Sequence, residues 1–196
     1  RAGAAALPMA TAVFTWVERN RTATPRYFSA TSQVLVEHAS PQAGSHTFIY
    51  LAGSEALTSR VSALLAPLRA GAADGDAAVL LPAEAFSTFV GLAVAGDARA
   101  GEVLTATGCP LDMSAQLADD FGEGAVLFGM AAWGLRDSRP AGGRTLVAAL
   151  AGNRCWLVED ASDDRSRLCI RHVSGAECQT AFLSLLEPLF AARAAG

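Results

Sequence analysis

The chain has 196 residues and a formal net charge of −4, and 52% of its residues are apolar while 17% are charged. All fifteen basic residues are arginine, and the lack of lysine excludes a P-loop nucleotide site, a Schiff-base lysine and a lysine general base. Arginines scattered along an acidic chain form no basic stripe for nucleic acid, and no apolar run reaches the roughly 18 residues of a membrane-spanning helix, so we expect neither a nucleic-acid partner nor a membrane span.

Strands are the first elements expected in chain order. Val13–Arg19 is typical of a strand and leads into a turn-forming segment. Tyr27–His38 predicts a long strand or a tight hairpin, and Thr47–Ala52 predicts a further strand after a polar loop.

A helix is predicted to follow from Ser54 to Leu68. Its apolar residues recur at the spacing i, i+4, i+7, i+8 and i+11, which gives one stripe along a helix. Pro67 lacks an amide donor and crowds the preceding turn, so the helix should kink or end there. The stripe consists of Leu57, Val61, Leu64, Leu65 and Leu68.

The middle of the chain predicts a different set of elements. Asp76–Leu81 favours a short strand, and Pro82–Ala95 favours a helix that begins at its proline. Asp97–Asp112 holds several glycines and predicts a loop, whereas Ser114–Phe121 predicts a second short helix that ends at Gly122.

Strands return in the last third of the chain. Val126–Arg136 predicts a strand, Thr145–Leu150 and Cys155–Glu159 predict a hairpin, and Leu168–Val173 predicts the last strand. A helix should follow, begun by a capping box of Ser174 and Glu177 and kinked or ended at Pro188. Its apolar stripe repeats the spacing of the earlier helix, with Cys178, Phe182, Leu185, Leu186 and Leu189.

Three pairs of matched strings indicate an internal duplication. The strings begin at Trp16 and Trp133, at Leu35 and Leu157, and at Leu64 and Leu185, so the copies are separated by 117, 122 and 121 residues. We therefore predict an α+β fold with a pseudo-twofold duplication of an antiparallel β unit closed by an amphipathic helix. Residues 1–196 should form one globular domain, with repeat units at 12–70 and 125–192 and a unique connecting segment at 71–124. Paired units of this kind resemble some secretion chaperones and small adaptor folds in shape alone.

Reactive groups in the sequence do not form a recognised catalytic or metal-binding pattern. Cys169 and His172 should point to opposite faces of a strand, with a buried thiol and a surface imidazole, which opposes a metal site. The adjacent acids Asp119 and Asp120 predict a solvated face. We expect no cofactor, no metal and no catalytic residue.

The cysteines and the chain start bear on the protein's setting. Four cysteines without a paired spacing predict reduced, buried thiols, which favours a reducing intracellular compartment. The sequence has no initiator methionine, so we expect a processed chain or a piece of a longer protein.

A non-enzymatic protein-binding or assembly subunit, adaptor or chaperone-like, is the function favoured by these patterns. Its protein partner, or a second copy of the chain, would bind at a sheet edge or a helix-lined groove. The matched residues Trp16, Arg19, Trp133 and Arg136 are the candidate partner-binding residues, although a core tryptophan and a solvent arginine at a strand end remain the simpler interpretation.

Two alternative functions remain open. One is a small-molecule-binding protein or enzyme, with a pocket between the repeats near residues 97–124. Its candidate polar groups are Arg99, Asp112, Asp119 and Asp120. The other, a shell protein, depends only on the high alanine content.

Overall fold

A computed structural model describes most of the chain, in ten segments. These segments are residues 9–18, 21–22, 26–31, 34–39, 47–50, 54–71, 77–122, 126–136, 139–162 and 164–185. Side chains are described for residues 58–71, 77–122, 126–130, 146–162 and 164–185.

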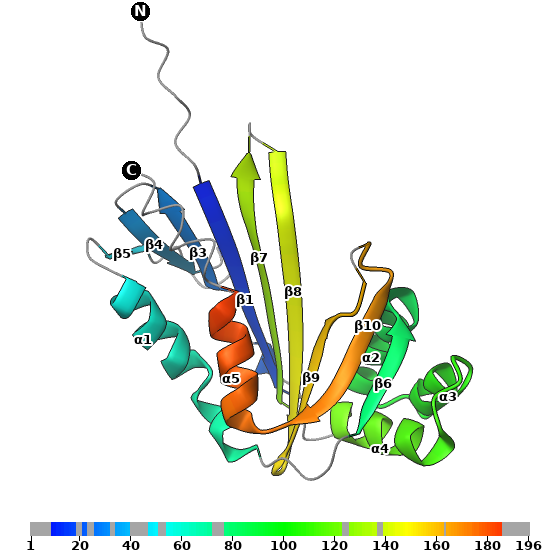
Figure 1. Cartoon of the computed structure of the whole chain (residues 1–196). Coiled ribbons are helices and arrows are strands. Elements are labelled where there is room, and N and C mark those ends of the chain that lie inside the picture. The colour runs from blue at the N-terminus through cyan, green and yellow to red at the C-terminus, as the bar shows by residue number, and fades with distance from the viewer. Residues whose placement is uncertain are drawn as a thin grey trace, which may run out of the picture.

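The described strands form one antiparallel sheet with the order β5-β4-β3-β1-β7-β8-β9-β10-β6, and the short β2 pairs with β1. Strands from the two halves of the chain meet near its centre, where β1 pairs with β7 (Figure 1). The bounds are β1 Met9–Glu18, β2 Arg21–Thr22, β3 Arg26–Thr31, β4 Val34–Ala39, β5 Thr47–Tyr50, β6 Ala78–Pro82, β7 Val126–Arg136, β8 Arg139–Ala151, β9 Arg154–Asp160 and β10 Arg167–Val173.

Helices cover the sheet in two groups. In Figure 1, α1 and α5 lie side by side, while α2, α3 and α4 gather at the β6 end of the sheet. A short 3-10 helix, η2, continues from α1 and packs against α5. The bounds are α1 Ser54–Leu64, η2 Ala66–Ala70, α2 Ala83–Ala95, α3 Ala100–Thr105, α4 Leu111–Phe121 and α5 Gly175–Ser184.

Strand β9 shows how one sheet supplies two cores. Because side chains alternate between the faces of a strand, Cys155 and Leu157 join the cluster beneath α1, η2 and α5. Trp156 and Val158 join the cluster beneath α2, α3 and α4. All four residues are at most 2% exposed. The sheet is therefore the middle layer between the two helix groups.

The described residues of the two predicted apolar stripes are buried, except for Leu64, which is partly buried. Val61, Leu65 and Leu68 are fully buried in the first helical segment. Cys178 and Phe182 are fully buried in α5, and Leu185 follows directly after it; Leu186, Leu189 and Pro188 lie outside the described residues. Pro67 lies in η2, where the α-helix has already ended, as its missing amide donor predicted.

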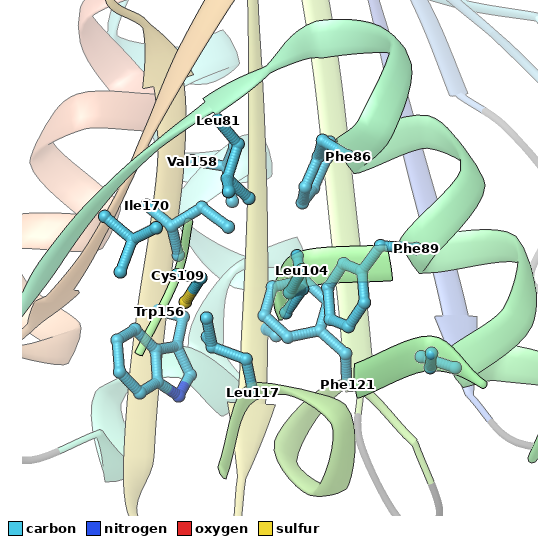
Figure 2. Packing of buried hydrophobic residues seen from close by; sticks show 14 of the residues in the cluster. Leu81, Phe86, Phe89, Leu104, Cys109, Leu117, Phe121, Trp156, Val158 and Ile170 are labelled. Carbon is cyan, nitrogen blue, oxygen red and sulfur yellow. The ribbon is translucent and has the colours of Figure 1, made fainter. Parts of the chain in front are cut away.

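Aromatic side chains fill the second core, between α2, α4 and the sheet (Figure 2). Phe89 and Phe121 are fully buried, and their ring centroids lie 5.2 Å apart. Phe86 stands edge-on to Phe121 at 6.1 Å. Such pairs add about 0.5–1.5 kcal/mol each to the free energy of burial, so this cluster fixes α2 and α4 on the sheet.

The predicted loop at Asp97–Asp112 is wrong in its middle, because Ala100–Thr105 forms α3. Gly96 adopts a left-handed conformation, with φ +73°, and ends α2 there. Ala100 and Leu104 are then one helical turn apart and both buried, so a short apolar pair provides the packing for α3. The glycines in this segment favoured a loop in the sequence analysis, so the helix was not predicted.

The strand predictions agree with the structure in most of their length. Segment Tyr27–His38 is a hairpin of β3 and β4, and β8 and β9 form the second predicted hairpin. Strand β6 begins at Ala78 and passes directly into α2 at Pro82. Within the described residues, no helix is both long and apolar enough to cross a bilayer.

Candidate functional site

An open groove of about 1160 Å³ lies among α2, α3 and α4 and is the candidate functional site. It runs between the end of α2 and the outer surfaces of α3 and α4, and we call it the helix-lined groove. Its lining residues are Ala93, Gly96, Asp97, Ala98, Ala100, Gly101, Glu102, Thr105, Ala106, Leu111, Ser114, Ala115, Ala118, Asp119 and Gly122.

Small residues shape the floor of the helix-lined groove. A Cβ added at Gly101 would lie 3.6 Å from the carbonyl oxygen of Ser114 and 3.8 Å from Cβ of Ala118, so α3 and α4 approach each other closely. The hydroxyl of Ser114 is buried and donates to the carbonyl oxygen of Cys109 over 3.4 Å. Because the lining side chains here are short, an occupant's backbone can come near the helices.

Acidic side chains give the groove its charge. Asp97, Glu102 and Asp119 line it, and its lining contains no arginine. Arg99, just outside the lining, binds Asp97 through a bidentate ion pair whose shortest contact is 2.7 Å. The net charge along the groove is therefore negative.

The Asp97–Arg99 pair keeps its carboxylate ionised. Hydrogen bonds from the Arg99 side chain and backbone amide lower the pKa of Asp97 from 3.8 to about 2. The same side-chain hydrogen bond raises the pKa of Arg99. Both charges are thus present throughout the physiological range.

An exposed leucine stands in the wall of the groove. Leu111 begins α4 and is 75% exposed, the highest value among the large apolar side chains that the structure describes. Water-facing apolar surface at the mouth of a groove is favourable to bury in a complex.

Asp120 lies beneath the groove and corrects the prediction of a solvated acidic face. The side chain is only 2% exposed, whereas its neighbour Asp119 is exposed. Asp120 Oδ2 accepts a 2.7 Å hydrogen bond from Nε1 of Trp156, and Oδ1 accepts one of 2.6 Å from Arg154. The helical phase of α4 turns one acid outward and the next inward, so Asp120 fastens α4 to β9.

The other polar candidates are only partly brought together. Asp119 lines the groove, Asp112 is exposed outside its lining, and Arg99 serves as the partner of Asp97. Every lining residue falls between 93 and 122, so the groove belongs to the connecting segment. The groove thus lies near residues 97–124, where the small-molecule alternative placed its pocket, but no residue of the two predicted repeat units lines it.

The predicted exposures of Cys169 and His172 are reversed in the structure. His172 is 9% exposed and its ring centroid lies 5.0 Å from that of Trp156, while Cys169 is partly exposed. The two residues do alternate in direction, but the face that carries His172 is the one covered by α2 and α4. Among the described residues, no three His, Cys, Asp or Glu side chains gather closely enough to hold a metal ion.

Candidate residues on the central strands are separated along the β1–β7 ladder. Trp16 has Phe128 as its Cα partner, and Trp133 has Thr11. Arg136 pairs with Arg139 of β8. The position of Arg19 and the side chains of Trp16, Trp133 and Arg136 lie outside the described part of the structure.

Comparisons with known proteins indicate the fold. No family model and no curated protein matches the chain. Among solved structures, the chain is similar to one in the structure of the Mycobacterium tuberculosis type VII secretion system chaperone EspG5 in complex with the PE25–PPE41 dimer. The TM-score is 0.57 at 14% sequence identity, and the match covers 94% of this chain and 74% of that chain. At this identity the likeness shows the α+β fold alone.

Proposed function

We propose that this chain is a non-enzymatic, chaperone-like protein-binding subunit that holds a segment of another protein in the helix-lined groove. The observation that carries the proposal is the strongly exposed Leu111 in the wall of an open, acidic groove. The fold shared with a chain from a chaperone complex is consistent with this role. The fold likeness supports the class of function, and the groove supports the place of binding.

The dimensions of the groove favour a protein segment over a small molecule. Small-molecule pockets are typically about 300–1,000 Å³ and enclose most of their ligand. The helix-lined groove has a volume of about 1160 Å³, just above this range, and is open to solvent. Its wall also lacks the aromatic side chains that usually hold such ligands, since the aromatic residues nearby are buried in the core below. A partner segment would therefore fill it better.

The negative charge of the groove indicates which kind of protein segment it would bind. Glu102 and Asp119 are exposed on the groove, and Asp97 adds a third carboxylate that Arg99 partly neutralises. Complementary potentials favour a partner with basic side chains beside small or apolar ones. The apolar part would cover Leu111, and the basic side chains would meet the carboxylates.

A groove-filling substitution tests this proposal. Ala115→Trp places a large side chain in the groove from an exposed position of α4, and Ser87→Trp places the same side chain on an exposed position of α2 outside the lining. Both variants and the unmodified chain are used to capture partners from native extract. We expect a stoichiometric protein with the unmodified chain and Ser87→Trp, and its loss with Ala115→Trp.

Two outcomes would contradict the proposal. A partner retained equally by Ala115→Trp would place the binding surface elsewhere. A small molecule that raises the melting temperature of the unmodified chain but not of Ala115→Trp, without any captured protein, would favour the ligand-binding alternative. Light scattering of the purified chain identifies a second copy as the occupant if Ala115→Trp abolishes a dimer.

A separate contact surface is proposed for Trp16, Arg19, Trp133 and Arg136. Its support is that Trp16, Trp133 and Arg136 belong to β1 and β7, the two central strands of the sheet. Alanine substitution of both tryptophans should weaken capture of the partner if this surface takes part. Unchanged capture would contradict that role.

We also propose that the sheet consists of two copies of one unit related by a pseudo-twofold axis. Val13 and Ala131 are Cα partners on the central strands. On their other sides, Val13 pairs with Tyr27 and Ala131 pairs with Thr145. An axis through the Val13–Ala131 pair exchanges Tyr27 with Thr145, which supports the duplication. Cross-strand NMR contacts between Val13 and Ala131 test the placement of this axis.

The same correspondence continues outward from the axis. Phe28 pairs with Glu37 in the first half, and Leu146 pairs with Glu159 in the second. Next to them, β5 is followed by α1 and β10 by α5. The repeated order of strands and closing helices supports repeat units near 12–70 and 125–192.

A further inference from the structure

Two buried cysteines come together beneath the start of α5. Cys155 lies near the beginning of β9 and Cys178 in the first turns of α5, and both are 0% exposed in the same hydrophobic cluster. The Cα partner of Cys155 is Val173, the last residue of β10. Only Ser174 separates Val173 from α5, so the chain returns Cys178 to the neighbourhood of Cys155.

Two glycines allow the backbone segments around the two cysteines to approach closely. A Cβ added at Gly71 would lie 2.5 Å from Cβ of Cys155 and 3.2 Å from the backbone nitrogen of Gly175. That nitrogen donates a 2.9 Å hydrogen bond to the carbonyl oxygen of Gly71. The end of η2, the start of β9 and the start of α5 therefore converge, which restrains the two cysteines relative to each other.

Each thiol lies close enough to shift the pKa of the other. The Cys178 thiol lowers the pKa of Cys155, whereas the Cys155 thiol and burial raise the pKa of Cys178. Because the thiolate is the nucleophile in thiol–disulfide exchange, the lowered pKa of Cys155 favours this sulfur for the first attack.

We propose that Cys155 and Cys178 are a disulfide-forming site that reacts with a small exogenous disulfide. The Cys155 thiolate attacks one sulfur of the reagent, which forms a mixed disulfide and releases the first reagent thiol. Cys178 then loses its proton and attacks Sγ of Cys155, which breaks the mixed disulfide and releases the second reagent thiol. Two protein thiols are oxidised, one reagent disulfide is reduced, and the two protons leave on the reagent thiols.

The new bond would tie α5 to β9. Brief opening of the first turn of α5 gives the reagent access to the buried sulfurs. The bond closes a loop between residues 155 and 178, which restricts the unfolded chain more than the folded one. A disulfide that closes a loop of this size in a chain of this length is expected to raise the melting temperature by roughly 5–10 °C.

The experiment treats the full chain with cystamine, blocks free thiols after unfolding, and maps the peptides by mass spectrometry. Before blocking, we expect a species lighter by about 2 Da, because two hydrogens are lost, and the peptide map after blocking should show Cys155 joined to Cys178. Cys109 should remain free, and the partly exposed Cys169 should at most carry a cysteamine group and no bond to another cysteine of the chain. The raised melting temperature should return to its starting value after reduction.

Variants separate this pair from the other cysteines. Cys109→Ser removes a thiol from the opposite core and should leave formation of the bond unchanged. Cys155→Ser should abolish it. If Cys155→Ser fails to fold, peptide mapping of the unmodified chain and of Cys109→Ser decides the matter. Recovery of Cys155 and Cys178 as free thiols, or bonded to other cysteines, would overturn the proposal.

Discussion

The indole of Trp156 on β9 donates a 2.7 Å hydrogen bond to the carboxylate of Asp120 on α4, and both side chains are at most 2% exposed. Arg154 reaches the same carboxylate over 2.6 Å from a half-exposed position, and this contact raises the pKa of the arginine. One carboxylate therefore satisfies a buried donor and a cation, and it sets the position of the helix that forms one wall of the groove.

Replacing Asp120 by alanine should destabilise the fold. The substitution leaves the buried Nε1 of Trp156 without its acceptor, and an unsatisfied buried donor costs about 1–3 kcal/mol. Urea unfolding measures the change in the free energy of unfolding. Asp119→Ala is the matched control and should change it by less than about 0.5 kcal/mol, since that side chain is exposed. Equal effects of the two substitutions would contradict the role assigned to Asp120.

The sequence predicted the order of most elements because long periodic stretches carry their own signal. The helices α1 and α5 followed from apolar spacing, and their described stripe residues are buried except for Leu64, which is partly buried. The burial of Asp120 did not follow, because two adjacent acids look alike until the phase of α4 and the position of Trp156 are known. The prediction that His172 is exposed was wrong for a similar reason. The alternation of side chains along a strand defines two faces of the sheet, but it does not show which face the helices cover.

The tryptophan match illustrates a further limit. The strings at Trp16 and Trp133 led to a shift of 117 residues between the central strands. The axis proposed through Val13 and Ala131 makes Trp16 correspond to Gly134, a shift of 118 residues rather than 117. The register of paired strands depends on which side chains are buried and on the turns between strands, and matched letters in the sequence do not reveal it.

Gly175 should not tolerate a side chain. A Cβ there would overlap the carbonyl oxygen of Leu68 and approach Cα of Arg69 at 3.1 Å, and both are backbone atoms of η2 that cannot rotate away. Gly175→Ala is expected to cost about 1–3 kcal/mol through overpacking. Thermal unfolding followed by circular dichroism measures this loss.

At Gly91, in contrast to Gly175, an added side chain should stabilise the fold. Gly91 lies in the interior of α2, and an added Cβ meets nothing within 4 Å. Gly91→Ala should therefore stabilise the chain by about 0.5–1 kcal/mol, because alanine restricts the unfolded backbone and favours the helix. If Gly175→Ala also stabilised the chain, the contact between η2 and α5 would not exist as described.

The hydroxyl of Ser174 caps α5 by accepting a 3.1 Å hydrogen bond from the amide of Glu177. The side chain of Glu177 accepts a 3.0 Å hydrogen bond from Arg171 of β10, so this side chain lies against that strand. Ser174→Ala should cost about 1 kcal/mol, whereas Ser174→Asp should retain most of the stability. Ser184→Ala, which removes only a hydroxyl bonded to the carbonyl of Ala181, is the control. A loss from Ser174→Asp as large as that from Ser174→Ala would argue against capping.

The acidity of Asp97 should depend on Arg99. Its folded-state pKa, about 2, lies below the ordinary value of 3.8. The stabilising contribution is therefore complete above about pH 4 and is lost as the pH falls through the folded-state value. Carboxyl-carbon NMR titration should show the low pKa in the unmodified chain and a shift toward 3.8 in Arg99→Leu.

Asp164 is the internal control for that titration. Its pKa is also about 2, but the hydroxyl of Ser162 and the amide and hydroxyl of Ser166 cause the shift, so Arg99→Leu should leave it unchanged. If Asp97 kept its low pKa without the Arg99 side chain, the backbone amide alone would hold the carboxylate. In either case the Asp97 carboxylate stays ionised at neutral pH.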